Sequence, residues 1–237
     1  MPNLLRRRNT RSTQSQNLIY ITQDVEATLK LFSEHQFRVP VQLSKDVSVT
    51  FFPSGHILGS SFIVLEAAGK TILFTSDLGR DNHPLLSIPD KPPASGIDVV
   101  VTEPTYGDRV HDTSAKSFAN EINAGLARGG TVLIPAFAVD RTEVILMALR
   151  ALIKEKKIPP VPIFVDSPMA IAALELYRRA VDENSTEIRP EVSQKWINQD
   201  PFDAGALEQL ATTEESKSIK DWHGSGILIS ASGMGSS

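Results

Sequence analysis

In one stretch of the first hundred positions apolar residues alternate with polar or small ones at a period of two, which is the pattern of a half-buried β-strand. The segment 47–51 alternates in this way. The apolar runs 62–65 and 71–74 flank a short Ala-Ala-Gly-Lys segment, so we predict a β-hairpin there. The run 97–101, which is β-branched except for Asp98, is interpreted as a buried strand. The first part of the chain is therefore predicted to be rich in β-structure.

The residues before this region combine a polar, basic segment with one strand and one helix. Residues 1–17 contain four arginines and no acidic side chain, and we expect a tail or loop. The run Leu18–Ile21 has strand character. Thr22 is predicted to be the N-cap of the helix that follows. The apolar residues of that helix, at helical spacing, are Val25, Leu29 and Phe32.

From about residue 112 onward the pattern changes to alternating helices and strands. Helical spacing marks the segments 118–126, 141–157 and 169–181. Short apolar strands are predicted at 131–134, 161–165 and 227–229. Because strand–helix–strand units with short connections build parallel sheets, we predict an α/β fold with a doubly wound, mainly parallel sheet in this part. We therefore expect two domains, 18–111 and 112–237.

Composition limits the chemistry that the chain can carry. The net charge is −4, so any contact with nucleic acid has to be local. The chain has no cysteine, which excludes disulfides, thiolate zinc sites and thiol nucleophiles; a metal site would need His, Asp and Glu. No run approaches the ~18–20 apolar residues that span a membrane. The N-terminal arginines are not followed by the apolar segment of a secretory signal, so we expect a cytoplasmic protein.

Three candidate side chains follow the ends of predicted strands. His56 lies between two glycines in Gly-His-Ile-Leu-Gly-Ser-Ser, Asp77 lies in Ser-Asp-Leu-Gly, and Glu103 begins Glu-Pro-Thr-Tyr-Gly. Each has a structural alternative, since a turn histidine or a strand-end carboxylate often only caps a turn. Together they form a set of nitrogen and oxygen donors that suits Zn²⁺ or Mn²⁺ and two-metal hydrolysis of phosphodiesters.

The order of six motifs resembles a known family. GHILGSS is followed by SDLG, TEPTYGDR, IPAFAVDRTEVIL, FVDSPMA and SASGM. This order is similar to that of the β-CASP branch of metallo-β-lactamase-fold nucleases, above all the RNA-processing members, over roughly residues 18–235. The resemblance implies a partial metallo-β-lactamase αββα sandwich in the first domain and a C-terminally truncated β-CASP domain in the second.

The resemblance also implies roles for the three strand-end residues. His56 matches a histidine that binds one zinc ion. Asp77 matches the aspartate that bridges the two zinc ions and belongs to the catalytic centre. Glu103 matches a catalytic-site acid that orients a histidine supplied by the β-CASP domain, which is a role beside the metal rather than on it.

Other residues are matched to substrate binding. Arg141 corresponds to a family arginine whose fork-shaped guanidinium suits an RNA phosphate, although a helix-start arginine could instead pair with Asp140 or Glu143. Ser232 and Gly233 fall in the Ser-Gly-Met segment near the substrate. Asp166–Pro168 is interpreted as mainly structural, with Ser167 capping a helix. Further arginines considered for RNA contact are Arg6 to Arg8, Arg109, Arg178 and Arg179.

The chain also departs from the family pattern. The family motif His-x-His-x-Asp-His, which supplies most metal ligands, is absent, and so are the C-terminal histidine motifs. The five histidines are His35, His56, His83, His111 and His223. Since a catalytic zinc usually needs three protein ligands, His56 and Asp77 alone are too few. The expectation is a fragment, inactive by itself, whose Met1 is an internal methionine of a longer protein.

Three functions stay open at this point. The first is a two-zinc ribonuclease, acting as an endonuclease and also as a 5′-exonuclease, on single-stranded RNA. The second is a non-catalytic β-CASP-like RNA-binding subunit, since the main ligand motif is absent. The third is a DNA-processing nuclease of the same fold, although the glutamate at 103 favours RNA. The expected partners are RNA and either a second copy of the chain or an RNA-processing complex, with no membrane.

Overall fold

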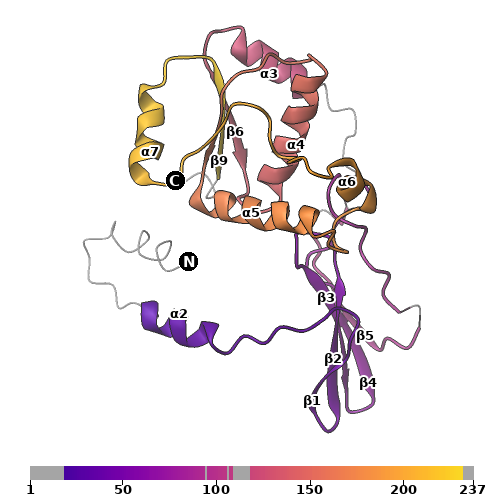
Figure 1. The fold of residues 1–237 in the computed structure, drawn as a ribbon. Helices are drawn as coiled ribbons and strands as arrows, with labels where there is room; N and C mark the ends of the chain where they lie inside the picture. The colour runs from indigo at the N-terminus through magenta and orange to yellow at the C-terminus, as the bar shows by residue number, and fades with distance from the viewer. Residues whose placement is uncertain (1–18, 94, 106, 109–117, 232–237) are drawn as a thin grey trace.

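The computed structural model describes residues 19–93, 95–105, 107–108 and 118–231. Figure 1 shows a β-sheet at one end of the molecule and an α/β body at the other. Helix α2 (Thr22–Leu29) precedes the sheet and lies apart from both. Within these residues, no helix has the length and apolar character to cross a membrane.

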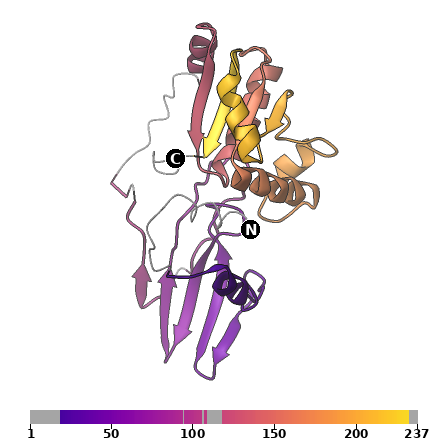
Figure 2. The same cartoon turned by 90° about the vertical axis from the view of Figure 1, so that its left-hand side faces the viewer.

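The first sheet is mixed and has the strand order β1-β2-β3-β4-β5. Its first three pairings are antiparallel, and β4 and β5 are parallel. The predicted hairpin is confirmed: its turn is Ala68-Gly69, where both residues have positive φ, which a hairpin turn of this kind requires. The strands lie side by side below the α/β body in Figure 2. They are Val41–Ser44, Val47–Pro53, Ser61–Ala67, Lys70–Phe74 and Val99–Val101.

Three expectations for the first part of the chain are wrong. Residues 19–21 form no strand, and Ile19 is 98% exposed because nothing in the described chain packs on it. The N-cap of α2 is Ile21 rather than Thr22, because the Asp24 carboxylate reaches back to accept the Ile21 N–H at 2.7 Å. Strand β5 is exposed rather than buried, since it pairs with β4 only and no described element covers it.

The second sheet is entirely parallel, with the order β6-β9-β7-β8. Its strands are Thr131–Ala136, Ile163–Asp166, Leu207–Gln209 and Gly226–Ala231, for β6, β7, β8 and β9 in turn. Helix α3 packs against β6, and α5 packs against β7. The predicted α/β class and the parallel sheet of the second part are therefore confirmed, although β8 was not predicted.

Two helices of the second part, α5 and α7, begin at a residue whose side chain caps the helix. Ser167 caps α5 through its side chain, which accepts the Ala170 N–H at 3.2 Å, and Pro168 occupies the first turn. The interpretation of this turn as structural is thus supported by its geometry. The helices are α3 (Phe118–Leu126), α4 (Arg141–Lys154), α5 (Pro168–Asp182), α6 (Pro190–Lys195) and α7 (Thr213–Ser218), followed by the 3-10 turn η1 (Ile219–Asp221).

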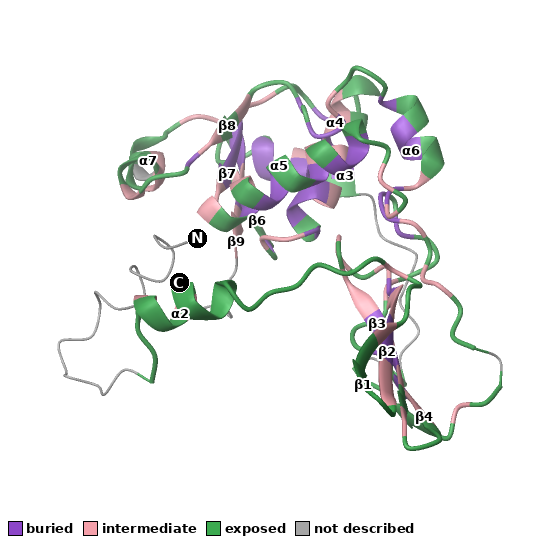
Figure 3. Ribbon diagram, turned by 60° about the horizontal axis from the view of Figure 1, so that its bottom comes forward, coloured by how far each residue is buried: buried purple, intermediate pink, exposed green. Residues whose placement is uncertain are grey.

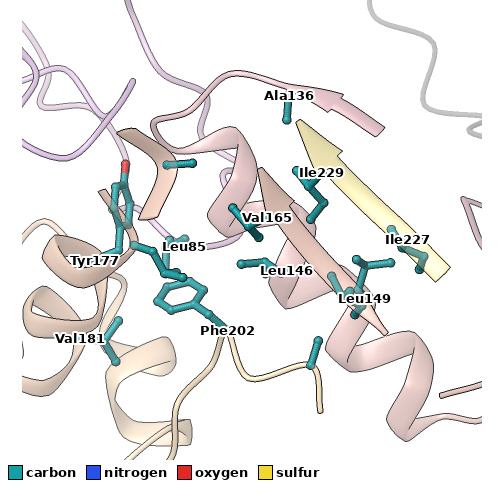
Figure 4. Packing of buried hydrophobic residues seen from close by; sticks show 14 of the residues in the cluster. Leu85, Ala136, Leu146, Leu149, Val165, Tyr177, Val181, Phe202, Ile227 and Ile229 are labelled. Atoms are coloured by element: carbon teal, nitrogen blue, oxygen red, sulfur yellow. The ribbon is translucent and has the colours of Figure 1, made fainter. Parts of the chain in front are cut away.

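Burial is concentrated in the α/β body, as the purple segments of Figure 3 show. Its core joins the central strands to α4 and α5 through Leu146, Val165 and Tyr177 (Figure 4). Leu85 and Leu86, which follow the first sheet, are also buried in this core. The cluster inside the first sheet is much smaller, and its buried members are Phe62, Val64 and Leu73. The first sheet therefore depends on its contacts with the second part.

Candidate metal-binding site

The loop that carries His56 is a tight turn closed by two serines. The Ser60 hydroxyl oxygen accepts the N–H groups of His56 and Ile57, each at 3.1 Å. The Ser54 hydroxyl donates to the same oxygen at 2.9 Å. Gly55 has φ +64°, a backbone conformation that residues other than glycine rarely adopt. This local network fixes the backbone at His56.

A close approach between two glycines brings the Asp77 loop to the His56 loop. A Cβ atom on Gly79 would lie 1.9 Å from the carbonyl oxygen of Gly55, so only glycine fits there. The Gly79 N–H donates to the Ser54 carbonyl at 2.8 Å and holds the two loops together. The glycine of the Ser-Asp-Leu-Gly motif therefore has a packing function that the sequence pattern did not reveal.

The two predicted metal-binding residues meet as a result. The Nε2 atom of His56 lies 3.7 Å from Oδ2 of Asp77, although the residues are 21 positions apart in the chain. Their side chains are 46% and 67% exposed. An imidazole nitrogen and a carboxylate oxygen thus lie at one accessible position, beyond the ends of β2 and β4 in the first sheet.

Glu103 follows β5, the parallel neighbour of the strand that precedes Asp77. Its carboxylate accepts the Thr105 N–H at 2.7 Å, so it closes a local turn. The Thr105 hydroxyl and N–H lower the pKa of Glu103, and the nearby His56 lowers it further. Glu103 is therefore held as a carboxylate within electrostatic range of His56, while its hydrogen bond also agrees with the simple turn-closing alternative.

The donor types at this position fit zinc, but their number does not complete a site. His56 supplies a ring nitrogen and Asp77 a carboxylate oxygen, both of which are zinc ligands. Among the described residues, no group of three or more His, Asp and Glu side chains is arranged to hold a metal ion. Further ligands would have to come from outside the residues that the structure describes.

The candidate substrate-binding residues that the structure describes differ in their contacts. Arg141 is exposed at the first position of α4, and no ion pair of this side chain is found in the described part of the chain. Arg178, in contrast, donates to both Glu175 and Asp200, which makes it a structural side chain. Arg179 is exposed on α5. The other candidates lie outside the described residues: Arg6 to Arg8, Arg109, Ser232 and Gly233.

Sequence reasoning missed a buried polar group between the two parts of the chain. The Asp140 carboxylate accepts the Tyr177 hydroxyl proton at Oδ1 (3.1 Å), and its Oδ2 lies 3.0 Å from Nε2 of His83. The His83 Nδ1 atom accepts the N–H groups of Leu85 and Leu86, so the ring proton lies on Nε2 and points to Asp140. Asp140 has φ +70° at the start of α4. No local sequence signal pairs residues so far apart.

Glu143, in the first turn of α4, is fully buried as well. Neither of its carboxylate oxygens has a hydrogen-bond partner among the described residues. Burial raises the pKa of Glu143 to about 7, and the negative charge of Asp140 adds to this, while nearby backbone groups of Glu143 and Asp140 lower it by less. Arg141 therefore has neither of the two acidic neighbours considered as its partners, because Asp140 is engaged elsewhere and Glu143 points inward.

Comparison with known proteins agrees with this architecture. Residues 142–237 match the Beta-Casp domain family, so the second part of the chain contains a Beta-Casp domain. The resemblance to β-CASP nucleases that the motifs indicate is thereby confirmed.

Relatives match over most of the chain. It is 36% identical over 191 residues to Ribonuclease TTHA0252 of Thermus thermophilus, covering 79% of this chain and 43% of that protein. It is 29% identical over 231 residues to an RNase J-like protein of Methanocaldococcus jannaschii, covering 94% and 52%. It is 29% identical over 181 residues to cleavage and polyadenylation specificity factor subunit 3 of Dictyostelium discoideum, covering 75% and 23%. The chain thus spans about half the length of these relatives, or less.

Proposed function

We propose that this chain forms part of a zinc-dependent ribonuclease that hydrolyses RNA phosphodiesters. The observation that carries the proposal is the approach of His56 to Asp77, at 3.7 Å, in a chain whose relatives include named ribonucleases. When bound, zinc supplies a Lewis acid that stabilises the negative charge developing on the phosphate. The two-metal site of the complete family pattern needs ligands beyond the described residues, so we expect this chain alone to be inactive.

The chain's own residues take separate parts in this proposal. His56 and Asp77 would hold the metal, and Asp77 would take the role of the bridging aspartate that its motif matches. Glu103, whose low pKa keeps it ionised, orients a histidine of the second domain. Arg141 is an exposed, unpaired cation in the described chain and binds an RNA phosphate. Ser232 and Gly233 complete the substrate-binding surface of the proposal.

Two observations favour a second function. The described residues contain no group of three metal-binding side chains, and one relative is named as a subunit of a cleavage and polyadenylation factor. A non-catalytic RNA-binding subunit would bind RNA through the same exposed arginine without hydrolysing it. The two functions differ in whether the unaltered protein cleaves RNA, and the first also requires that this cleavage depend on Asp77.

Replacement of Asp77 tests the choice. In the protein encoded by the complete reading frame, Asp77→Ala is expected to lower the rate of single-stranded RNA cleavage by at least about a hundredfold, since even residues around metal ligands contribute 10–100-fold. Asp46→Ala is the matched control, because Asp46 is an exposed carboxylate in the turn between β1 and β2. Full cleavage by the Asp77→Ala protein would refute the metal-binding role. RNA binding without any cleavage by the unaltered protein would favour the second function.

A further inference from the structure

The His56 loop is held by two side chains from the second part of the chain. The Leu58 N–H donates to the Tyr177 hydroxyl at 3.0 Å. The next residue, Gly59, donates its N–H to Oε1 of Glu187 at 2.8 Å. Two successive backbone N–H groups, two and three residues after His56, therefore depend on acceptors more than a hundred positions away.

The Tyr177 hydroxyl is fixed on both sides. Tyr177 is 1% exposed, and its hydroxyl accepts from Leu58 while donating to Asp140. Figure 4 shows it at the edge of the core with its oxygen directed away from the packed side chains. Burial and the charge of Asp140 raise the pKa of Tyr177 far above its usual range, so the hydroxyl keeps the proton that it donates. A lone pair of the hydroxyl oxygen therefore accepts the Leu58 N–H.

The segment that supplies Glu187 also holds the chain that follows Asp77. The Ser87 N–H donates to the Glu187 carbonyl at 2.8 Å, and Leu86 pairs with Ile188 in an antiparallel bridge. The Arg189 side chain donates to the carbonyl of His83 at 2.5 Å and to that of Asp81. One short segment of the second part thus contacts both the His56 loop and residues 81–87, which follow the Asp77 turn.

We propose that Tyr177 and Glu187 are positioning residues, which fix the His56 loop so that the β-CASP part sets the approach of His56 to Asp77. The inference rests on the function proposed above, because it concerns the same site. Neither side chain contacts His56 or Asp77 directly in the described structure, so both act through the backbone of Leu58 and Gly59. A residue with a merely structural role would stabilise the fold without affecting the His56 loop in particular.

Three variants distinguish the effect of losing each hydrogen bond from a general loss of stability. Tyr177→Phe removes the hydroxyl and keeps the ring that fills the core. Glu187→Ala removes the acceptor of the Gly59 N–H. Glu187→Gln keeps an oxygen acceptor at that position and should restore what Glu187→Ala loses. Thr142→Val is the matched control, because it deletes another buried hydroxyl, which donates to the Phe137 carbonyl at 3.0 Å and does not contact the loop.

The first measurement is hydrogen exchange of the 237-residue chain, without metal. We expect the Leu58 N–H in Tyr177→Phe and the Gly59 N–H in Glu187→Ala to exchange about three- to tenfold faster, as the loss of one hydrogen bond implies. Amides in β7 should change no more than they do in Thr142→Val. If Leu58 and Gly59 keep their original exchange rates, or accelerate only as much as β7 does, the positioning role is overturned.

The second measurement uses the protein encoded by the complete reading frame, in which the remaining ligands are expected. It is a titration with Zn²⁺, followed by the NMR signals of the His56 ring. We expect about tenfold weaker binding in Glu187→Ala, restored in Glu187→Gln, since residues that orient metal ligands contribute on this scale. Equal Zn²⁺ affinity in unaltered and Glu187→Ala chains would overturn the inference. If Zn²⁺ leaves His56 undisturbed even in the unaltered protein encoded by the complete reading frame, the metal-binding function fails instead. The exchange rates alone then decide whether the loop is positioned from the second part.

Discussion

Glu143 is a buried carboxylic acid whose ionisation opposes folding. In the folded chain its pKa is about 7, because burial and the nearby Asp140 disfavour the charged form, whereas 4.5 is its usual value. Between these two pH values the folded state holds a proton that the unfolded state has released. The stabilising effect of this proton is complete below pH ~4.5 and is lost as the pH rises through about 7.

Glu143→Gln removes this pH dependence. We therefore compare the free energy of unfolding of the variant with that of the original chain. The variant's value minus the original's should be larger at pH 8 than at pH 5 by roughly 1–3 kcal/mol, because only the original chain loses stability over this range and one pKa unit corresponds to about 1.4 kcal/mol. Urea unfolding at both pH values measures it. Glu208→Gln, at an exposed glutamate of β8, is the control and should show no such change. A relative stability that is identical at both pH values would contradict the raised pKa.

At the scale of elements, the turns that follow two strands are in backbone contact at a pair of glycines. The turn after β2 and the turn after β4 touch where Gly79 meets the carbonyl of Gly55. Their contact places His56 and Asp77 together more directly than the strands themselves do, since β2 and β4 are separated by β3 in the sheet. The geometry of the candidate site therefore depends on a position without a side chain.

Gly79→Ala should force the two turns apart. Its Cβ atom would lie 1.9 Å from backbone, which cannot give way as a flexible side chain would. We expect a loss of about 1–3 kcal/mol, the usual cost of overpacking, and a melting temperature lower by roughly 3–10 °C. The crystal structure of the variant should show a His56–Asp77 separation greater than 3.7 Å.

Gly130→Ala is the matched control for this change. Gly130 has no atom within 4 Å of an added Cβ and no positive φ, so alanine should fit there without loss of stability. If Gly79→Ala melts at the same temperature as Gly130→Ala and keeps the His56–Asp77 distance, the contact between the glycines does not determine the site.

At the scale of the whole molecule, the first sheet is stabilised from outside. Its own buried cluster has three members, whereas Leu85 and Leu86 beyond β4 are buried in the large core of the α/β body. Hydrogen bonds between segments 83–87 and 186–189 add to this attachment. The two parts are therefore expected to unfold together.

Leu86→Ala tests this coupling. Leu86 is 1% exposed, so its truncation should cost about 2–5 kcal/mol, as for other buried leucines. Because it joins the two parts, hydrogen-exchange protection should fall in both β3 and β7. Leu43→Ala, at a residue of β1 that is 62% exposed, is the control and should alter neither. Loss of protection in β7 alone would mean that the first sheet is stable without the attachment.

The amino-acid sequence by itself determined the main elements and the class of the fold. Strands β2, β3, β4, β6, β7 and β9 and helices α3, α4 and α5 follow from the periodicity of neighbouring residues, which depends on local geometry. The order of six motifs was enough to identify the family. Short elements such as β1, β8 and α7 were not predicted, because a few residues carry too little periodicity.

Only the tertiary structure decided which distant groups meet. The approach of His56 to Asp77, the group of His83, Asp140 and Tyr177, and the exposure of β5 all depend on contacts between segments far apart in the chain. The run 97–101 has the composition of a buried strand, but burial is a property of what covers a strand. A sequence pattern records which side chains prefer to be covered, and the three-dimensional arrangement decides whether another segment lies there to cover them.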